Sequence, residues 1–376
     1  MRILFLAFRD PLNPYLGGGD IYINELAKGC AKRGHSVTFL SSRFPGSCTY
    51  ENVENLHVIR LGSNFTLVFK FFIFYFLHLR GQFDVVVEEI LGGPRIPFFG
   101  SLYMKERIVG IIQEKHKEIF FQQFSFPIAA SLSLLERILV LLNRNKQLIV
   151  NSSRTKEDLI EMGYKAENLH IVHPGLPNYF FDLHSEGFSS RKPMVLCLTK
   201  IRRYKLIDDA VRAIEKVHKK LNNCELVIAG RTNEVELEYE DELNQLVDKL
   251  NIRGIVHFEK NICESRKINL LKQSRALVLP SAIEGFGIVV IEANACGTPA
   301  IVSDRVPADA AKDGYNAAVF PCHDLDSLSE EIISLLSDEV RWNRISINSV
   351  EWAKKFTWSS SVEKFAEVIE SCQQRN

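Results

Sequence analysis

Short apolar runs alternate with amphipathic stretches through the second half of the chain. The runs have the length of buried strands, and the stretches between them repeat apolar residues at helical spacing. The expected strands are 194–198, 226–229, 255–258, 276–279 and 300–302, and the expected helices are 207–220, 237–250, 266–273 and 288–295. Fully apolar strands that alternate with helices are typical of a parallel sheet covered on both faces.

The first half repeats this alternation less regularly. Its expected strands are 3–7, 36–40, 84–87, 108–112 and 147–150, and its expected helices are 20–33 and 154–162. The polar stretch 179–192, which contains Pro and Ser, breaks the pattern and is the expected linker. The predicted fold class is α/β, with two Rossmann-like doubly wound domains (1–178 and 193–357) whose strands end at one central cleft.

A phenylalanine-rich run covers residues 65–79. It is shorter than the roughly 20 residues that a membrane-spanning helix needs, and it contains Lys70. Two interpretations remain open. The run is either a buried core helix or a helix partly exposed at a membrane surface or at an apolar groove for an acceptor.

Composition narrows the function classes. A chain of 376 residues is long enough for two domains, and its 46 basic and 46 acidic residues give no field typical of a nucleic-acid binder. The eight cysteines include no pair at C-x-x-C spacing, which favours reduced thiols in a cytoplasmic setting. The first apolar run is too short for a signal peptide and is expected to be a buried strand.

Two carboxylates eight residues apart provide the strongest chemical signal. Glu284 and Glu292 flank a glycine-bearing turn between an expected strand and a helix that begins near Gly287. Two helical turns would separate them by about 12 Å, too far to flank one glycosidic bond, which needs roughly 5 to 9.5 Å. The spacing fits two acids at opposite ends of a long ligand, with helix N–H groups between them facing an anion. A nucleotide sugar has this layout.

The chain resembles glycosyltransferase family 4, the retaining enzymes that share the two-domain GT-B fold, and the resemblance covers almost its whole length. The most specific match is Glu284-x7-Glu292 in its Pro-Ser-x-x-Glu-Gly-Phe-Gly setting. Residues 151–159, closing at Gly163, resemble the strand–helix near the family's hinge, and 171–176 resemble its exit from the first domain. The last helix (358–376), opened by residues 356–358, resembles the family's terminal helix that crosses back to the first domain.

The resemblance implies roles for the residues of the second domain. Glu292 is expected to bind the ribose hydroxyls, and Glu284 to contact sugar hydroxyls near the reaction centre. Backbone N–H groups come from the turn that contains Gly285, Phe286, Gly287 and Ile288. The family usually has Gly-Arg followed by Lys where this chain has Thr199-Lys200 and Lys205, so two cations are kept near the departing diphosphate.

Lys200 cannot make the bidentate contact of an arginine, and Arg202 or Arg203 is a candidate replacement. A solvated basic turn is the alternative interpretation of these cations. Two further departures, Gly230-Arg231 and Glu259, put the contacts to the base in doubt rather than the fold.

Two groups in the first domain complete the expected donor site. Gly17, Gly18 and Gly19 match neither the dinucleotide fingerprint nor a P-loop, but they let backbone N–H groups approach a phosphate or a sugar. His116 stands where the family often has a catalytic-site histidine near the donor sugar. The alternatives are a flexible surface turn and a structural histidine.

No metal or cofactor is expected beyond the nucleotide sugar, because the resemblance implies metal-independent chemistry. Asp324-Leu325-Asp326 resembles a metal motif, but Asp324 is expected to cap the following helix. The expected activity is retaining hexosyl transfer from a UDP- or GDP-sugar to a glycan or lipid-linked acceptor, in the cytoplasm or at the membrane's cytoplasmic face. Two alternatives remain: a nucleotide-sugar epimerase, and a non-catalytic nucleotide-binding partner subunit.

Overall fold

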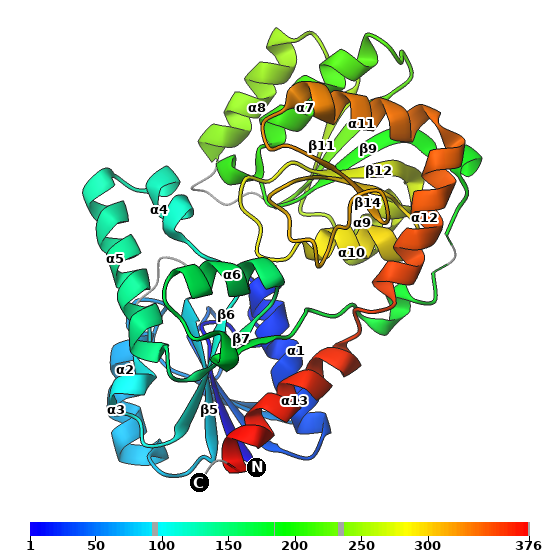
Figure 1. Ribbon diagram of the computed structural model, residues 1–376. Helices are drawn as coiled ribbons and strands as arrows, with labels where there is room; N and C mark the ends of the chain where they lie inside the picture. Colours follow the sequence, from blue (N-terminus) through cyan, green and yellow to red (C-terminus); the bar gives the residue numbers. More distant parts are fainter. Residues whose placement is uncertain (92–96, 184, 232–236, 375–376) are drawn as a thin grey trace. The chain divides into compact units, whose positions relative to one another are not determined.

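The computed structural model describes residues 1–91, 97–183, 185–231 and 237–374. The chain divides into two compact units (Figure 1): unit 1 contains Met1–Gly175 and Thr357–Asn376, and unit 2 contains Leu176–Phe356. The expected linker 179–192 lies within unit 2. Phe180 is buried there, and the buried Arg191 guanidinium donates hydrogen bonds to backbone carbonyls of unit 2, including that of Cys296 at 2.6 Å.

Unit 1 contains an eight-stranded sheet in the order β3-β4-β2-β1-β5-β6-β7-β8, parallel except for the antiparallel pair β3–β4. The strands are β1 (Arg2–Leu6), β2 (Ser36–Ser41), β3 (Tyr50–Val53), β4 (Leu56–Arg60), β5 (Val85–Leu91), β6 (Arg107–Ile112), β7 (Gln147–Val150) and β8 (Leu169–Ile171). Each strand expected in this half is present. The strands β3, β4 and β8 were not predicted, because they are short and each contains polar residues that interrupt an apolar run.

Helices cover both faces of this sheet (Figure 1). One face is covered by α1 (Gly18–Lys32) and α13 (Trp358–Gln374), whose apolar residues pack on Ile3, Phe5 and Val85. The remaining helices of unit 1 are α2 (Leu67–Phe74) with its π-helical continuation η1 (Tyr75–Leu79), α3 (Gly100–Tyr103), α4 (Lys117–Gln123), α5 (Phe126–Asn143), α6 (Ser153–Glu161) and the 3₁₀ turn η2 (Ala166–Asn168).

The phenylalanine-rich run forms α2 and η1 and has two different sides. Leu67, Phe71 and Tyr75 are buried, whereas Phe69 and Ile73 are more than half exposed. The interpretation as a fully buried core helix is therefore wrong. The helix packs on the sheet with one side and leaves the other open to solvent.

Unit 2 contains a wholly parallel six-stranded sheet in the order β11-β10-β9-β12-β13-β14. The strands are β9 (Lys192–Leu198), β10 (Glu225–Gly230), β11 (Val256–Lys260), β12 (Ser274–Leu279), β13 (Ala300–Ser303) and β14 (Ala317–Phe320). The helices are α7 (Ile207–His218), α8 (Leu237–Lys249), α9 (Glu264–Gln273), α10 (Ile288–Ala295), α11 (Leu325–Ser337) and α12 (Glu339–Ala353), with 3₁₀ turns η3 (Asn178–Phe180), η4 (Phe188–Ser190) and η5 (Arg203–Lys205).

Every strand and helix expected in the second half is present, and the α/β class with two Rossmann-like units is confirmed. Two apolar cores lie on the two faces of the unit 2 sheet, because alternate residues of one strand enter different cores: Val195 enters one, and Leu196 the other. All eight cysteines are unpaired.

Candidate functional site

The turn between β12 and α10 places the two predicted acids differently from the sequence-based expectation. Gly287 is the N-cap of α10, with a left-handed φ of 92°, so the helix begins where it was expected to begin. Glu284 lies before this cap, in the loop. The estimate of about 12 Å assumed a helix throughout, and it does not apply, because only the part from Ile288 to Glu292 is helical.

Glu284 and Lys205 form an ion pair with Nζ and Oε2 2.7 Å apart. Their side chains are only 16% and 11% exposed, so solvent screens the pair weakly. The Ala282 N–H donates to the Tyr204 carbonyl at 2.8 Å, which fixes the two loops against each other. Unit 2 therefore brings together a carboxylate and a cation that stand 79 residues apart in the sequence.

Glu292 has a partner that the sequence analysis missed. Lys267 of α9 lies 2.7 Å from its carboxylate and also pairs with Glu264 at 2.8 Å. Burial raises the pKa of Glu292, and the Lys267 ammonium opposes that rise. We infer that the Lys267 ammonium favours the ionised form of Glu292 and fixes the orientation of its carboxylate. The carboxylate can then accept hydrogen bonds from hydroxyl groups of a ligand.

Replacing Lys267 by Met is therefore expected to weaken UDP binding by about fivefold at neutral pH, since a carboxylate without its cation protonates more readily. The loss should grow as the pH falls, because removal of the Lys267 ammonium raises the pKa of Glu292 further, and a larger fraction of its carboxylate is then protonated at each lower pH. Titration calorimetry with UDP from about pH 7.5 to about pH 5.5 measures this dependence.

Two further variants make this test specific. Lys267→Arg should restore most of the affinity, and Lys272→Met, on the same helix and paired with Glu186, should leave it unchanged. A UDP affinity of Lys267→Met equal to that of the wild type over the whole pH range would exclude this role.

Lys200 follows β9, where the strand ends beside β10. The Thr199 N–H donates to the Ala229 carbonyl at 3.0 Å, and a Cβ at Gly230 would come within 1.8 Å of the Thr199 carbonyl oxygen. Glycine is thus required at position 230 by backbone contact. Lys200 itself is exposed and stands five residues before Lys205.

The two candidate arginines in this turn differ in their contacts. Arg203 makes a bidentate pair with Glu242, with both N···O distances 2.6 Å, so its guanidinium is directed to α8. Arg202 donates to the Tyr204 hydroxyl at 3.0 Å. Arg203 is thus held by a carboxylate, whereas Arg202 contacts a tyrosine hydroxyl, and the assignment of either arginine to phosphate stays a prediction.

The glycine loop of unit 1 forms the beginning of α1, with Gly17 as the N-cap. The Asp20 carboxylate accepts the Gly17 N–H at 2.7 Å and pairs with Arg9 at 3.0 Å. Gln113 donates to the Gly19 carbonyl at 3.1 Å, and a Cβ at Gly18 would meet no atom within 4 Å. The absence of a side chain at Gly18 therefore leaves space for a ligand close to the backbone. The Gly17 N–H, however, already donates its hydrogen bond to Asp20.

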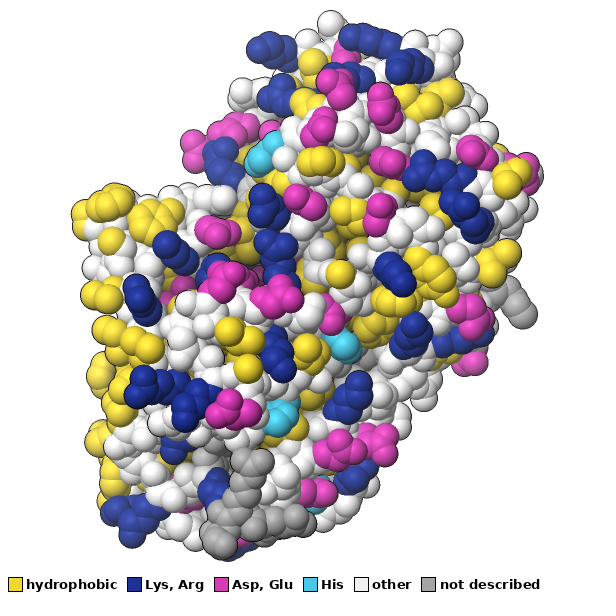
Figure 2. Space-filling model, in the orientation of Figure 1, with side chains coloured by type: hydrophobic (Ala, Val, Ile, Leu, Met, Phe, Trp, Pro, Cys, Tyr) yellow, Lys and Arg dark blue, Asp and Glu magenta, His cyan; other side chains and the backbone are white. Residues whose placement is uncertain are grey.

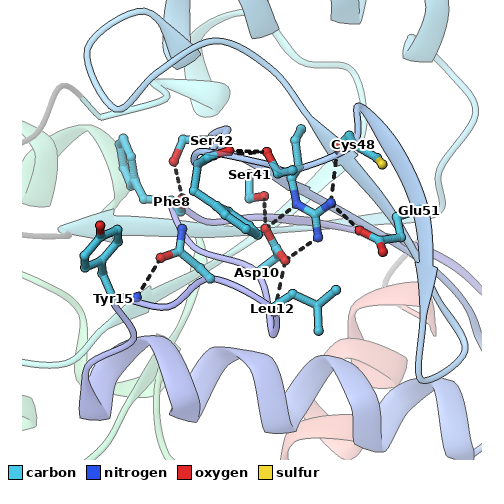
Figure 3. A network of polar contacts seen from close by, with 12 residues as sticks. Phe8, Asp10, Leu12, Tyr15, Ser41, Ser42, Cys48 and Glu51 are labelled. Atoms are coloured by element: carbon cyan, nitrogen blue, oxygen red, sulfur yellow. Dashed lines mark hydrogen bonds and ion pairs between the residues drawn. The ribbon is translucent and has the colours of Figure 1, made fainter.

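A buried polar network holds the chain between β1 and this loop (Figure 3). Asp10 accepts hydrogen bonds from Arg60 at 2.7 and 2.8 Å and from Ser41 at 2.8 Å, and Arg60 also pairs with Glu51 at 2.6 Å. Burial raises the pKa of Asp10, but these hydrogen bonds outweigh it and hold that pKa below its usual value. The network fixes the path of the loop that leads to Gly17.

His116 is nearly buried at the N-terminus of α4. Its backbone N–H donates to Glu136 at 2.7 Å, and its ring stacks on Phe120 with 5.8 Å between ring centroids. Its Nδ1 makes no hydrogen bond to any part of the chain that the structure describes. The Nδ1 lies 3.8 Å from Glu136 Oε1, and the Nε2 lies 3.7 Å from Glu114 Oε1, so both ring nitrogens face carboxylates. These contacts favour a structural contribution, and the catalytic assignment stays a prediction.

Asp324 caps α11 by accepting the N–H groups of Asp326 and Ser327, each at 3.1 Å, which confirms the capping prediction. Within the described ranges, no group of three or more His, Cys, Asp or Glu side chains is arranged to hold a metal ion. Metal independence stays a prediction.

Comparison with protein families assigns both halves of the chain. Residues 180–352 match the family model for glycosyl transferases group 1, and residues 16–177 match that for glycosyltransferase family 4.

Two similar proteins are also glycosyltransferases by name. The chain is 28% identical over 227 residues to a D-inositol 3-phosphate glycosyltransferase from Mycolicibacterium smegmatis, a match that covers 58% of this chain but only 51% of that protein. It is 25% identical over 313 residues to a D-inositol 3-phosphate glycosyltransferase from Catenulispora acidiphila, covering 78% of this chain and 74% of that protein.

Solved structures extend the likeness to the whole fold. Sucrose-phosphate synthase from Thermosynechococcus elongatus superposes with a TM-score of 0.80 at 18% identity, covering 99% of this chain and 98% of that one. Anabaena HepE in complex with UDP-glucose gives a TM-score of 0.78 at 18% identity, covering 99% and 100%. At this identity the superpositions establish the fold alone. The chain therefore belongs to glycosyltransferase family 4 and has the GT-B fold.

Proposed function

We propose that this protein transfers a hexosyl group from a nucleotide sugar to an acceptor, with retention at the anomeric carbon and without a metal ion. The observation that carries the proposal is the pairing of Glu284 with Lys205 beside the start of α10. A carboxylate, a cation and a helix N-terminus lie in one region of unit 2. These are the groups that a sugar with a departing diphosphate requires.

The residues of unit 2 contact different parts of the nucleotide sugar in the proposed reaction. Glu292 accepts the ribose hydroxyls, and the turn from Gly285 to Ile288 offers backbone N–H groups to the diphosphate. Lys205 and Lys200 neutralise the charge that develops as the diphosphate leaves. Glu284 binds sugar hydroxyls beside the anomeric carbon.

The chemical step is a same-face substitution. The bond between the anomeric carbon and the phosphate oxygen breaks, and the acceptor oxygen forms its bond on the same face of the sugar. A phosphate oxygen takes the acceptor's proton, so the products are the glycosylated acceptor and a nucleoside diphosphate. No protein nucleophile is needed.

Relatives support a uridine donor. Anabaena HepE has been solved with UDP and with UDP-glucose, and it shares this fold. We propose UDP-sugars ahead of GDP-sugars for this chain. The acceptor is proposed to be a glycan or a lipid-linked molecule presented at the cytoplasmic face of a membrane, because unit 1 exposes many large apolar side chains.

The test begins with thermal-shift measurements across UDP-, GDP- and ADP-sugars, since a bound ligand raises the stability of the native state by mass action. The stabilising donor is then incubated with candidate acceptors, and the anomeric configuration of the product is read by proton NMR. An α-linked donor should give an α-linked product, and activity should survive EDTA.

Four outcomes contradict the proposal. An inverted product excludes retention, and loss of activity in EDTA excludes metal independence. Release of an epimerised free sugar without any acceptor identifies an epimerase instead. Stabilisation by nucleotides without turnover of any donor indicates a non-catalytic nucleotide-binding subunit.

A further inference from the structure

Two helices of unit 1 cover the same face of its sheet. Along β5, Val86 and Ile90 point to the face opposite Val85 and Val87, since side chains alternate along a strand. Val86 packs in one core with Phe71 and Tyr75 of α2 and η1, and Ile90 packs in another with Leu139 of α5. The outer sides of α2, η1 and α5 therefore lie on one side of unit 1, where Figure 1 shows them together.

The short helix α3 connects the two. Tyr103 contacts Phe72 with 5.0 Å between ring centroids, and the Ser101 hydroxyl donates to the Asn143 side chain at the end of α5. The surface formed by the outer sides of α2, η1 and α5 is called the apolar face below. It is one surface of unit 1 rather than two separate patches.

Large apolar side chains dominate this apolar face. Phe69 and Phe126 are 64% and 74% exposed. Its exposed members include Phe69, Phe72 and Ile73 on α2 and Phe126, Leu134 and Ile138 on α5. Figure 2 shows hydrophobic side chains gathered along this edge of unit 1, interspersed with Lys and Arg. So much contiguous apolar surface is unusual in contact with water alone and marks an interaction site.

The charges on the apolar face have one sign. Between Phe65 and Arg80 the sequence contains no acidic residue, while Lys70 and Arg80 are exposed. On α5 the one acidic side chain, Glu136, is buried and accepts the His116 N–H, whereas Arg137 is exposed. Exposed aromatic and aliphatic groups with cations among them complement an anionic lipid surface, where the apolar groups enter the acyl boundary and the cations meet the headgroups.

The helix α5 is long and apolar enough to cross a membrane, the one such helix in the described part of the chain. Its other side, however, packs into unit 1: Leu139 and Val140 are buried against β6 and β7, and Tyr164 donates to the Asn143 carbonyl at 2.6 Å. A helix held in this way lies along a surface rather than spanning a bilayer.

We propose that the apolar face docks on an anionic lipid bilayer, with α2, η1 and α5 lying in the plane of the interface. The biological role of this docking rests on the proposed function: it would bring the acceptor-binding unit of a glycosyltransferase to a lipid-linked acceptor. The docking itself needs no catalysis, so it can be tested separately.

Flotation of the full chain tests the docking. The vesicles are an equal mixture of phosphatidylcholine and phosphatidylglycerol, with pure phosphatidylcholine as the comparison. The wild type should float with the anionic vesicles at low salt, and binding should weaken as salt is added. The variants Phe69→Ser/Phe72→Ser and Phe126→Ser/Leu134→Ser should each lower the fraction bound by about tenfold or more. The variant Lys70→Gln/Arg80→Gln should weaken binding to the anionic vesicles alone.

A matched control removes equally exposed apolar groups from unit 2. Val340 and Ile347 of α12 are 81% and 67% exposed, so Val340→Ser/Ile347→Ser should float as the wild type does. Far-UV circular dichroism and the affinity for UDP report whether each variant is folded, and both should be unchanged in all of them.

The outcomes are decisive in both directions. Wild-type protein that stays unbound at low salt, or serine pairs that float as well as the wild type, overturns the proposal. A wild type that sediments as a dimer without lipid, while the Phe69→Ser/Phe72→Ser variant is a monomer, assigns the apolar face to a contact between copies instead. Vesicle binding without affinity for any nucleotide sugar would contradict the proposed function and leave the docking intact.

Discussion

Glu284→Gln is expected to lower kcat by on the order of 100-fold, about 2.7 kcal/mol, while the Kd for UDP changes by less than about threefold. Glutamine keeps the size and one acceptor oxygen but removes the negative charge. That charge lies 2.7 Å from Lys205 and, in the proposed reaction, beside the anomeric carbon where positive charge develops. UDP lacks the hexose that Glu284 is proposed to bind, so the affinity for UDP does not include a contact between Glu284 and the sugar.

Substitution of Glu292 should affect UDP affinity more than kcat, the reverse of the result expected for Glu284. Glu292→Ala is expected to weaken UDP binding by roughly tenfold with a smaller effect on kcat, because the carboxylate acts on the ribose. Glu331→Gln, in an ion-paired glutamate of α11, serves as the control for the loss of a charge. Calorimetry gives the Kd values and steady-state kinetics gives kcat. If Glu284→Gln and Glu292→Ala both retain transfer within twofold of the wild type, the assignment of this site is wrong.

The turn at the start of α10 could be predicted from the sequence because local geometry determines it. The left-handed φ of 92° at Gly287 favours glycine, and the buried end of β12 requires an apolar run before the turn. The same reasoning applies to the central strands of both sheets, which are buried on both faces and are therefore mostly apolar, although β5 also contains the buried Glu88 and Glu89.

The partner of Glu292 could not be predicted in this way. Lys267 stands 25 residues before Glu292, and the two meet only because α9 packs beside α10. The spacing of Glu264 and Lys267 indicates a helical pair on α9 but not what faces it. Long-range pairs of this kind depend on the order of the strands, which the pattern of a single chain does not determine.

The helix α5 was missed for a different reason. Its apolar residues continue around the helix, since Phe126 and Leu134 on the outer side are as apolar as Leu139 and Val140 on the inner side. The periodicity that marks an amphipathic helix is therefore weak. The apolar residues on the outer side of α5, which weaken its amphipathic periodicity, are also the residues that form the proposed interaction surface.

Lys205→Ala is expected to lower kcat by roughly tenfold or more, about 1.4 kcal/mol, because the cation acts most strongly as the diphosphate leaves. Lys205→Arg, which keeps the charge, should retain most of the activity, and Lys216→Ala, in an exposed pair with Asp326, should have no effect. Turnover and UDP affinity in Lys205→Ala equal to those of the wild type would mean that the basic turn is only a solvated loop.

The ion pair makes a sharper prediction than either single variant. In the wild type the Glu284 carboxylate is 16% exposed and lies 2.7 Å from the Lys205 ammonium. When Lys205 is removed, this carboxylate loses its cation and repels an incoming diphosphate. UDP should therefore bind several-fold more tightly to Lys205→Ala/Glu284→Gln than to Lys205→Ala alone, although kcat of the double variant should be no higher than that of Glu284→Gln. Calorimetry on the four proteins of this cycle gives the sign of the coupling. If the two substitutions weaken UDP binding additively, Lys205 and Glu284 do not act on the nucleotide as a pair, and Lys205 would have to contact the diphosphate independently of the acid.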